Sequence, residues 1–298
     1  MEDVENVSRR RKKFLLLLLK LLLTGLCIWY VSGKIDVAEA GLALRRAKPG
    51  WLVIAFLAFI LSKCFAALRL NIYFRDIGIR LTEIANIRLY LMGMFYNLFL
   101  PGSVSGDAYK VILLGKRYQV AYKKGAAAVL IDRVSGVLGL GILLCFFSLY
   151  VLPDPMYRFI PAAATIAGIA GLYLLTRFFF RDFLQSYVPT LLAALLVQGS
   201  QVVCAWCILK ALGIDTYENV YLFLFLLSSI VSVLPLTIGG LGARELVFLE
   251  GARYFGLEQE PAVMVSLIFY LITLLTSAAG IVYVFRDPLG PGALKKDP

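Results

Sequence analysis

Leu100 to Lys110 reads LPGSVSGDAYK and Leu234 to Arg244 reads LPLTIGGLGAR, and these two stretches decide how the chain folds. Each interrupts a long apolar run with Pro and Gly. When the second stretch is laid over the first at a constant offset of 134 (235 − 101), Lys110 falls on Arg244 and Gly106 on Gly240. The coincidence indicates an internal repeat.

The surroundings of the two breaks make them informative. Inside a bilayer, each freed backbone N–H or C=O group costs several kcal/mol unless protein or water satisfies it, so a broken segment is expected to line a cavity. Paired interruptions in the two halves of a transporter point to its binding site. Two unrelated Pro/Gly kinks would also produce the pattern, since both residues are common in transmembrane helices.

The composition is that of a membrane protein. Of the 298 residues, 60% are hydrophobic and 16% are charged, whereas about a quarter of the residues in a soluble domain are charged. Several apolar runs reach the roughly 20 residues that span a hydrocarbon core about 30 Å thick. We therefore predict an all-α polytopic membrane protein.

Apolar runs with the length of full spans cover about residues 14–32, 51–72, 126–151, 158–179, 189–212 and 261–285. The two broken segments, about 86–115 and 219–256, lie between these runs and are predicted to be re-entrant helical hairpins. Six full spans place both termini on one side of the membrane. The first hairpin then enters from that side and the second from the other, which is the geometry of an inverted repeat.

Positive charges assign a side to this arrangement. The cluster RRRKK from Arg9 to Lys13 precedes the first span, and the loops on the same predicted side hold more Lys and Arg than the loops on the other side. Under the positive-inside rule this side is cytoplasmic. Arg45, Arg46 and Lys48 cluster on the opposite side, against this rule.

The chain divides into three parts by composition. We expect residues 1–13 to form a basic cytoplasmic N-terminus and residues 14–285 to form the transmembrane domain. Residues 286–298 are rich in Pro and Gly and are expected to be a disordered cytoplasmic tail. The expected location is the inner (cytoplasmic) membrane of the cell, which the chain crosses several times.

Some cations lie within or at the edges of apolar runs, namely Lys20, Lys63, Arg69, Lys110, Arg133 and Arg244. An ionisable residue at membrane depth is expensive and is a functional candidate by default. Lys110 and Arg244 are the strongest candidates because each follows a Gly-containing break where a new half-helix begins. The free N–H groups of that first turn already favour an anion, and a cation adds to the attraction.

The carboxylates near these cations are Asp107, Asp132, Glu245 and Glu250. Asp132 and Arg133 are neighbours in sequence and point to different faces of a helix, so they are expected to pair across helices rather than with each other. The candidate partners of Asp132 are Lys110 and Arg244. Those of Arg133 are Asp107 and Glu245. A structural ion-pair network and a substrate or proton relay both fit these residues.

Several kinds of chemistry have no support in the sequence. It contains no His, the commonest general base and metal ligand, and no P-loop pattern. We therefore expect no enzyme, no metal or other cofactor and no nucleic-acid partner. The cysteines lie in apolar runs and are interpreted as packing residues: Cys27, Cys64, Cys145, Cys204 and Cys207.

Four motifs resemble a known family. They are NLFLPG from Asn97 to Gly102, GDAYK from Gly106 to Lys110, Asp132 with Arg133, and Pro235 followed by Gly239, Gly240, Gly242, Arg244 and Glu245. Over residues 14–285 the chain is similar to the flippase-like transmembrane region of the lysylphosphatidylglycerol synthases and its stand-alone relatives. The soluble aminoacyl-transferring domain of the full-length synthases is absent from the sequence. Lys110 and Asp132 depart conservatively from the Arg and Glu expected at these positions.

This resemblance implies a protein that moves a lipid between leaflets without modifying it. We expect an anionic phospholipid or a polyprenyl-phosphate lipid, with its headgroup bound by Lys110, Arg244 and Arg133. Asn97, Gly106 and Gly240 complete the predicted binding site. Transport would be passive or ion-coupled, and the predicted proton carriers or ion-pair partners are Asp107, Asp132 and Glu245.

Two readings from other classes remain open at this point. The chain would be an accessory subunit of an envelope lipid-modification or glycosylation system, working with partner enzymes, if it moved no lipid by itself. It would be an intramembrane lipid-phosphate transferase if its isolated acids supplied a nucleophile or a metal cluster.

Overall fold

The structure is a computed structural model that describes residues 18, 21–22, 25–26, 29–30, 33, 45–99, 105–234, 237 and 240–290. The expected N-terminus at 1–13, most of the expected span at 14–32, Cys27 and the end of the expected tail at 291–298 lie outside these residues. So do residues 100–104, 235–236 and 238–239 of the two breaks.

The described part of the chain is helical and contains no strand. Within the described residues, five helical segments are long and apolar enough to cross a membrane: Pro49–Asp76 (α3), Tyr122–Val151 (α6), Pro155–Phe179 (α7), Arg181–Leu212 (η1, Arg181–Ser186, with α8, Tyr187–Leu212) and Gln259–Phe285 (α11, Gln259–Ala278, with η2, Ala279–Ile281, and α12, Val282–Phe285). They correspond to the last five of the six expected spans. The protein is therefore a multi-pass membrane protein.

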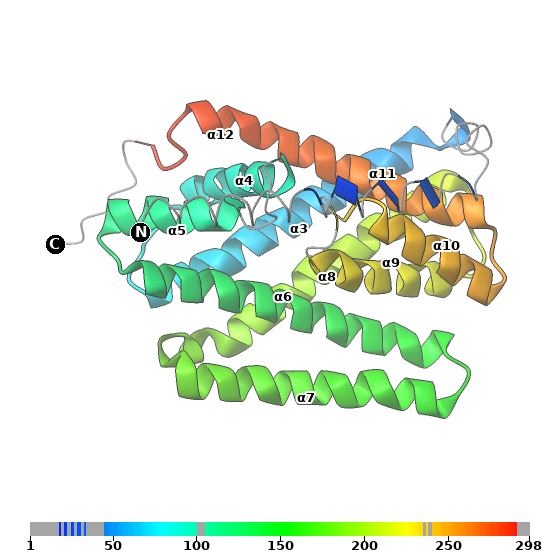
Figure 1. The fold of residues 1–298 in the computed structure, drawn as a ribbon, viewed down its shortest axis with the longest axis horizontal. Coiled ribbons are helices and arrows are strands. Elements are labelled where there is room, and N and C mark those ends of the chain that lie inside the picture. The colour runs from blue at the N-terminus through cyan, green and yellow to red at the C-terminus, as the bar shows by residue number, and fades with distance from the viewer. Residues whose placement is uncertain are drawn as a thin grey trace.

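Each broken segment forms a pair of shorter helices. The first hairpin consists of α4 (Glu83–Phe99) and α5 (Ser105–Tyr118), and the second consists of α9 (Glu218–Val233) and α10 (Ala243–Phe255). The helices of each pair pack against each other. In Figure 1, α4 and α5 occupy one end of the long axis and α9 and α10 the other.

Contacts between the ends of helices define these two ends of the bundle. At the end where α3 finishes, the Ser186 hydroxyl donates to the Asp76 carboxylate at 2.7 Å, and Lys124 pairs with Asp182 at 3.0 Å. At the opposite end, the Lys48 N–H donates to the Ala211 carbonyl at 2.9 Å. Because α4 follows α3 and α9 follows α8, the two hairpins start from opposite ends of the bundle.

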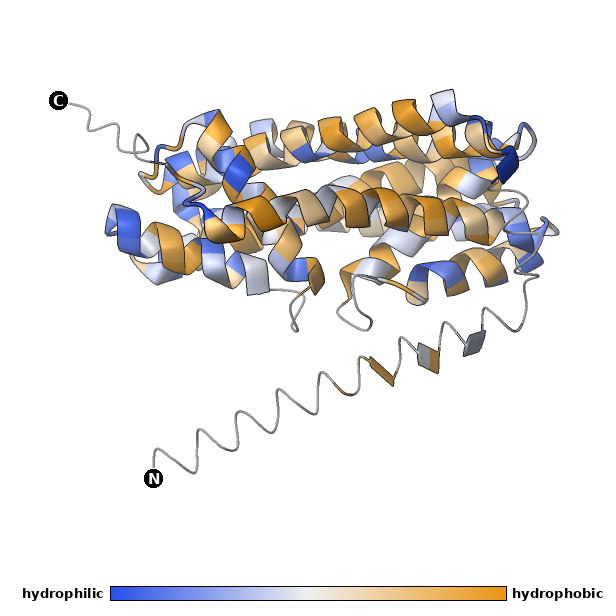
Figure 2. Ribbon diagram, turned by 90° about the horizontal axis from the view of Figure 1, so that it is seen from above, coloured by the Kyte–Doolittle hydropathy of each residue, from blue (hydrophilic) through white to orange (hydrophobic). Residues whose placement is uncertain are grey.

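Hydrophobicity follows the same axis. Seen from above, the middle of the long helices is mostly hydrophobic, while hydrophilic residues gather toward both ends (Figure 2). Large apolar side chains on the outward faces are exposed, for example Ile166 on α7 at 69% and Leu275 on α11 at 63%. An apolar belt between two polar ends is the surface that a bilayer requires.

Two large apolar clusters lie in the interior of the described part of the chain, one beside each hairpin. Phe59, Phe225 and Phe269 lie at the centre of the cluster that holds α9 and α10 against α3, α8 and α11. Their rings meet edge to face, with centroids 5.4 Å and 4.8 Å apart for the two pairs that Phe269 makes. The other cluster packs α4 and α5 against α3 and α6, and it includes Leu289 from the segment expected to be a disordered tail.

A close backbone contact joins the two helices of the first hairpin. A Cβ atom on Gly106 would lie 2.1 Å from the carbonyl oxygen of Gly93 in α4. A Cβ on Gly93 would meet the side chain of Lys110 at 2.2 Å. Glycine at both positions therefore lets α4 and α5 approach closely and places Lys110 across the backbone of α4.

Candidate functional site

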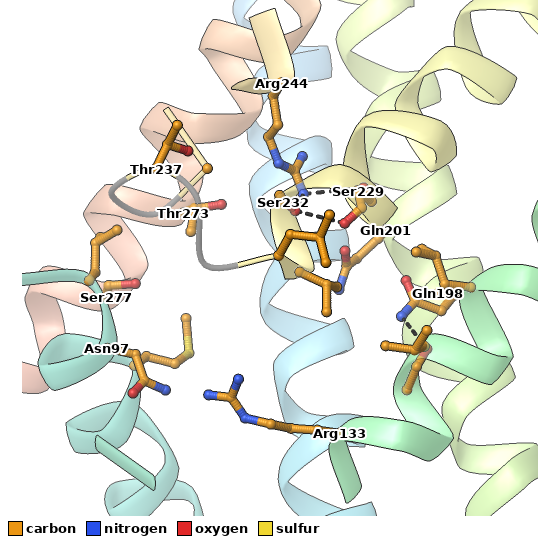
Figure 3. A pocket seen from close by; sticks show the side chains of 18 residues that line it. Asn97, Arg133, Gln198, Gln201, Ser229, Ser232, Thr237, Arg244, Thr273 and Ser277 are labelled. Carbon is orange, nitrogen blue, oxygen red and sulfur yellow. Dashed lines mark hydrogen bonds between the residues drawn. The ribbon is translucent and has the colours of Figure 1, made fainter. Parts of the chain in front are cut away.

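A cavity of about 390 Å³ lies where the described ends of the two hairpins meet α6, α8 and α11. The hairpins contribute Asn97 and Leu98 from α4, Ser229 and Ser232 from α9, and Arg244 from α10. Figure 3 shows polar side chains from several helices around this space. The complete lining is Met94, Asn97, Leu98, Arg133, Gly136, Val137, Leu140, Gln198, Gln201, Ser229, Ser232, Val233, Leu234, Thr237, Gly240, Arg244, Thr273 and Ser277.

Arg244 is the most distinctive side chain of the cavity. It is 9% exposed, and its Nη2 donates to the hydroxyl oxygens of Ser229 at 3.1 Å and Ser232 at 3.2 Å. The guanidinium carbon lies 4.9 Å from the ring centroid of Phe269 and 5.8 Å from that of Phe225. Among the described residues, Nη1 has no hydrogen-bond partner and no carboxylate forms an ion pair with the group.

The start of α10 explains why Glu245 does not neutralise its neighbour. The Glu245 carboxylate accepts from the Gly242 N–H at 2.6 Å and from the Ser266 hydroxyl at 2.7 Å. It therefore caps the first turn of α10 and ties this turn to α11. Of the two candidate partners of Arg133, Glu245 is therefore not the one that pairs with it, because these bonds direct its carboxylate to α10 and α11.

Gly240 gives the second break its shape. Its φ of +82° lies in the left-handed region that favours glycine, and a Cβ there would meet the Ser232 side chain at 2.9 Å. The Gly240 carbonyl accepts from the Arg244 N–H at 3.1 Å. This turn places the side chain of Arg244 against α9.

The first break is closed by a different polar contact. The Asn97 side-chain oxygen accepts from the Gly106 N–H at 2.9 Å and so links the end of α4 to the first turn of α5. Asn97 also lines the cavity, whereas Gly106 does not belong to its lining. Of the three residues that the family motifs added to the predicted site, Asn97 and Gly240 reach the cavity.

Lys110 does not line the cavity. It is 4% exposed, and its Nζ lies 3.1 Å from Asp107 Oδ1 and 4.7 Å from the ring centroid of Tyr90. Arg133 Nε donates to Asp107 Oδ2 at 2.6 Å, and Arg133 Nη2 forms an ion pair with the same oxygen at 2.6 Å. The pairing expected between Arg133 and Asp107 is therefore confirmed, and one carboxylate holds two cations.

Asp132 has a partner that the sequence analysis did not propose. Its Oδ1 accepts from Arg69 Nε at 2.7 Å, and both side chains are buried. The expectation that Asp132 pairs with Lys110 or Arg244 is wrong, because α3 and α6 pack together and bring Arg69 to this position. Arg69 is 5% exposed and lies in the interior of the bundle.

Lys63 on α3 is a further cation in the apolar interior. Its Nζ lies 4.4 Å from the ring centroid of Phe59, and Phe59 packs edge to face on Phe269, the ring that Arg244 contacts. Aromatic faces attract a cation without neutralising its charge. Lys63 and Arg244 are therefore supported by one connected group of rings.

Polar residues of the cavity that the sequence analysis missed lie in apolar runs at helical spacing. Ser229 and Ser232 are three residues apart in α9, as are Gln198 and Gln201 in α8, so each pair shares one face of its helix. The Gln198 amide donates to the Gly136 carbonyl of α6 at 3.2 Å. Two polar residues three positions apart within an otherwise apolar run are the sequence pattern that predicts such cavity-lining residues.

In chemical terms the cavity is suited to an anion. Guanidinium and hydroxyl groups supply hydrogen-bond donors, and the cavity contains no carboxylate among its lining residues. Guanidinium presents its donors in a planar fork that matches a phosphate or carboxylate. Arg244 enters this space from α10 and Arg133 from α6 (Figure 3).

Comparison with known proteins places the chain in a family. Residues 17–280 match the family described as the lysylphosphatidylglycerol synthase TM region. A UPF0104 membrane protein of Pyrococcus horikoshii is 26% identical over 143 residues, a stretch that covers 47% of this chain and 42% of that relative. The family match covers both hairpins, the first four described spans and the fifth as far as residue 280. The chain therefore belongs to the lysylphosphatidylglycerol synthase transmembrane-region family.

Proposed function

We propose that this protein moves a lipid with an anionic, phosphate-bearing headgroup between the two leaflets of the membrane, as a flippase or scramblase. The headgroup crosses through the cavity, and the hydrocarbon chains stay in the bilayer. The observation that carries the proposal is Arg244, a buried guanidinium at the cavity that has one nitrogen without a partner and no ion pair with a described carboxylate.

The cost of burying Arg244 supports an anion as the missing partner. Burial of a cation without a counter-charge destabilises a protein by several kcal/mol. Hydrogen bonds to two hydroxyl groups and cation–π contacts with two aromatic rings offset only part of that cost. An intramembrane cation is retained where it serves a substrate or an ion. An anionic headgroup between Arg244 and Arg133 would supply the charge that the protein does not.

The hairpins provide a route to the cavity from both sides. We take α4–α5 and α9–α10 as re-entrant hairpins of an inverted repeat, which together with the five described spans and a sixth at 14–32 form the transmembrane domain. Sites of this kind lie near the bilayer midplane at the interface between repeats, and rocking of one repeat against the other exposes them alternately. The headgroup would then enter past one hairpin and leave past the other.

Positive charges orient this arrangement. Basic residues at the end of the bundle near Asp76 and Lys124 are Arg75, Arg80, Lys116, Arg117, Lys123, Lys124, Arg177 and Arg181. Those near the opposite end are Arg45, Arg46, Lys48, Arg158, Lys210 and Arg253. The first end is more basic, and we propose that it faces the cytoplasm of a cell with this protein in its cytoplasmic membrane.

The carboxylates take a positioning role in this proposal. Asp107 holds Lys110 and Arg133, Asp132 holds Arg69, and Glu245 caps α10. Each of these carboxylates is therefore held by partners within the protein. We therefore propose movement down the lipid gradient as the basic activity, with no reaction on the lipid.

The test is transport by the purified protein without any partner. Vesicles would contain fluorescent analogues of phosphatidylglycerol, a polyprenyl phosphate and, as a neutral control with the same chains, diacylglycerol. We expect protein-dependent movement of at least one phosphate-bearing lipid, measured by bleaching of the outer-leaflet label. Movement that appears only after partner enzymes are added would favour an accessory subunit and contradict the proposal.

A further inference from the structure

A groove of about 510 Å³ runs between α5 and α6 on the outside of the first hairpin. Its walls are apolar and include Val111 and Ile112 from α5 and Val129 and Leu130 from α6. Ile112 is 48% exposed and Leu130 is 51% exposed. Because α6 is long and apolar enough to span a membrane, we infer that the exposed face of this groove lies toward the bilayer hydrocarbon.

The groove and the cavity share one side chain. Arg133 lines both, and its partner Asp107 lines the groove. Both nitrogen–oxygen distances of the ion pair between them are 2.6 Å. This ion pair therefore forms a polar partition between the polar cavity and the apolar groove. A lipid requires this combination, with a polar space for its headgroup next to an apolar space for a chain.

The charges allow the partition to open. The side chain of Lys110 is 4% exposed and that of Asp107 is 9% exposed, whereas that of Arg133 is 39% exposed. If Arg133 turns toward an anion in the cavity, Asp107 keeps the ion pair with Lys110 and is not left as an uncompensated buried charge. Arg133 is thus the exchangeable cation of this group and Lys110 the permanent one.

We propose that the groove between α5 and α6 holds one hydrocarbon chain of the transported lipid, and that Arg133 leaves Asp107 to bind the anionic headgroup in the cavity. This inference rests on the proposed function, since it takes the same headgroup as its starting point. It adds two points. One lipid chain lies between α5 and α6, and the headgroup enters the cavity from that side of the bundle. Continuity of the two spaces at Arg133 selects a lipid as the occupant.

Photochemical labelling tests the groove directly. The full-length protein is placed in vesicles that contain either phosphatidylglycerol or diacylglycerol, each with the same diazirine-bearing acyl chain. After irradiation, labelled residues are identified by mass spectrometry. We expect α5 and α6 groove residues to be labelled several-fold more by phosphatidylglycerol than by diacylglycerol, and exposed α7 residues such as Ile166 to be labelled equally by both.

A groove-filling variant provides a second readout. Ala126→Phe places a ring in the groove from an exposed position on α6, and Ala167→Phe places one at an exposed position on α7 as the matched control. Ala126→Phe should reduce both the phosphatidylglycerol-dependent labelling and lipid movement several-fold, and Ala167→Phe should change neither.

The experiments distinguish an error in the proposed lipid-chain site from an error in the proposed function. Equal labelling of the groove by both lipids, or normal labelling and movement in Ala126→Phe, would overturn the proposal that the groove holds a lipid chain. The proposed transport through the cavity would remain. Headgroup-dependent labelling in a wild-type protein that moves no lipid would uphold the groove as a binding site and overturn the proposed transport.

Discussion

Among single residues, four buried or half-buried cations fall into two groups according to what compensates their charge. Arg69 and Lys110 each bind a carboxylate within the protein. Arg244 and Lys63 instead contact aromatic rings, which attract a cation but leave its charge available to an anion. Under the proposed function, this difference separates cations that stabilise the fold from cations that can bind the lipid headgroup.

The first group makes a prediction about stability. Arg69→Gln or Asp132→Asn alone should destabilise the protein by about 3–5 kcal/mol, because each leaves a buried charge without its partner. The double variant should recover much of that loss, since no charge is stranded. Thermal unfolding of the four proteins in one detergent measures the coupling. Additive losses in the double variant would show that the pair does not act as a unit.

The repeat also shows how far residue roles could be predicted from the sequence. Lys110 and Arg244 occupy equivalent positions, and on that basis both were expected to bind the headgroup. The position equivalent to Asp107 in the second copy is Leu241, so an ion pair three residues along the helix is possible only in the first copy. That difference is present in the sequence and separates the two cations.

At the scale of elements, the first hairpin depends on the contact between Gly93 and Gly106. Gly106→Ala would push α4 and α5 apart, because its Cβ would lie 2.1 Å from the Gly93 carbonyl oxygen. Overpacking of this kind costs about 1–3 kcal/mol. Because the hairpin carries Asn97 and Asp107, we expect both the midpoint of thermal unfolding and the rate of lipid movement to fall.

Gly199→Ala on α8 is the matched control, since a Cβ at this position has no neighbouring atom within 4 Å. It should leave the unfolding midpoint unchanged or raise it, because Ala favours a helix over Gly. If both Ala variants behave alike, the close approach of α4 and α5 does not limit the stability of the hairpin.

Elements were easier to predict than contacts between them. Apolar length alone predicted the five described spans, because only a long apolar helix satisfies its backbone within a bilayer. The partner of Asp132 could not be predicted in the same way, since it depends on how α3 crosses α6. Packing of the whole bundle sets that crossing, and no local pattern around Arg69 encodes it.

At the scale of the whole molecule, the two hairpins start from opposite ends of the bundle. Lys123 at the start of α6 and Thr216 before α9 are both exposed and lie at different ends. In a variant without native thiols, Lys123→Cys should react with an impermeant maleimide from the cytoplasmic side only, and Thr216→Cys from the outer side only. Labelling of both positions from one side would contradict the inverted arrangement.

The rate of lipid movement in Arg244→Gln tests the central claim most directly. Arg253→Gln, an exposed change on the same helix, is the control. A hydrogen bond to a charged group contributes about 1.5–3 kcal/mol, so losing it at the headgroup should slow movement of the phosphate-bearing lipid by roughly tenfold to a hundredfold. We predict this loss in Arg244→Gln with normal membrane insertion, and wild-type movement in Arg253→Gln. Wild-type movement in Arg244→Gln would contradict the account.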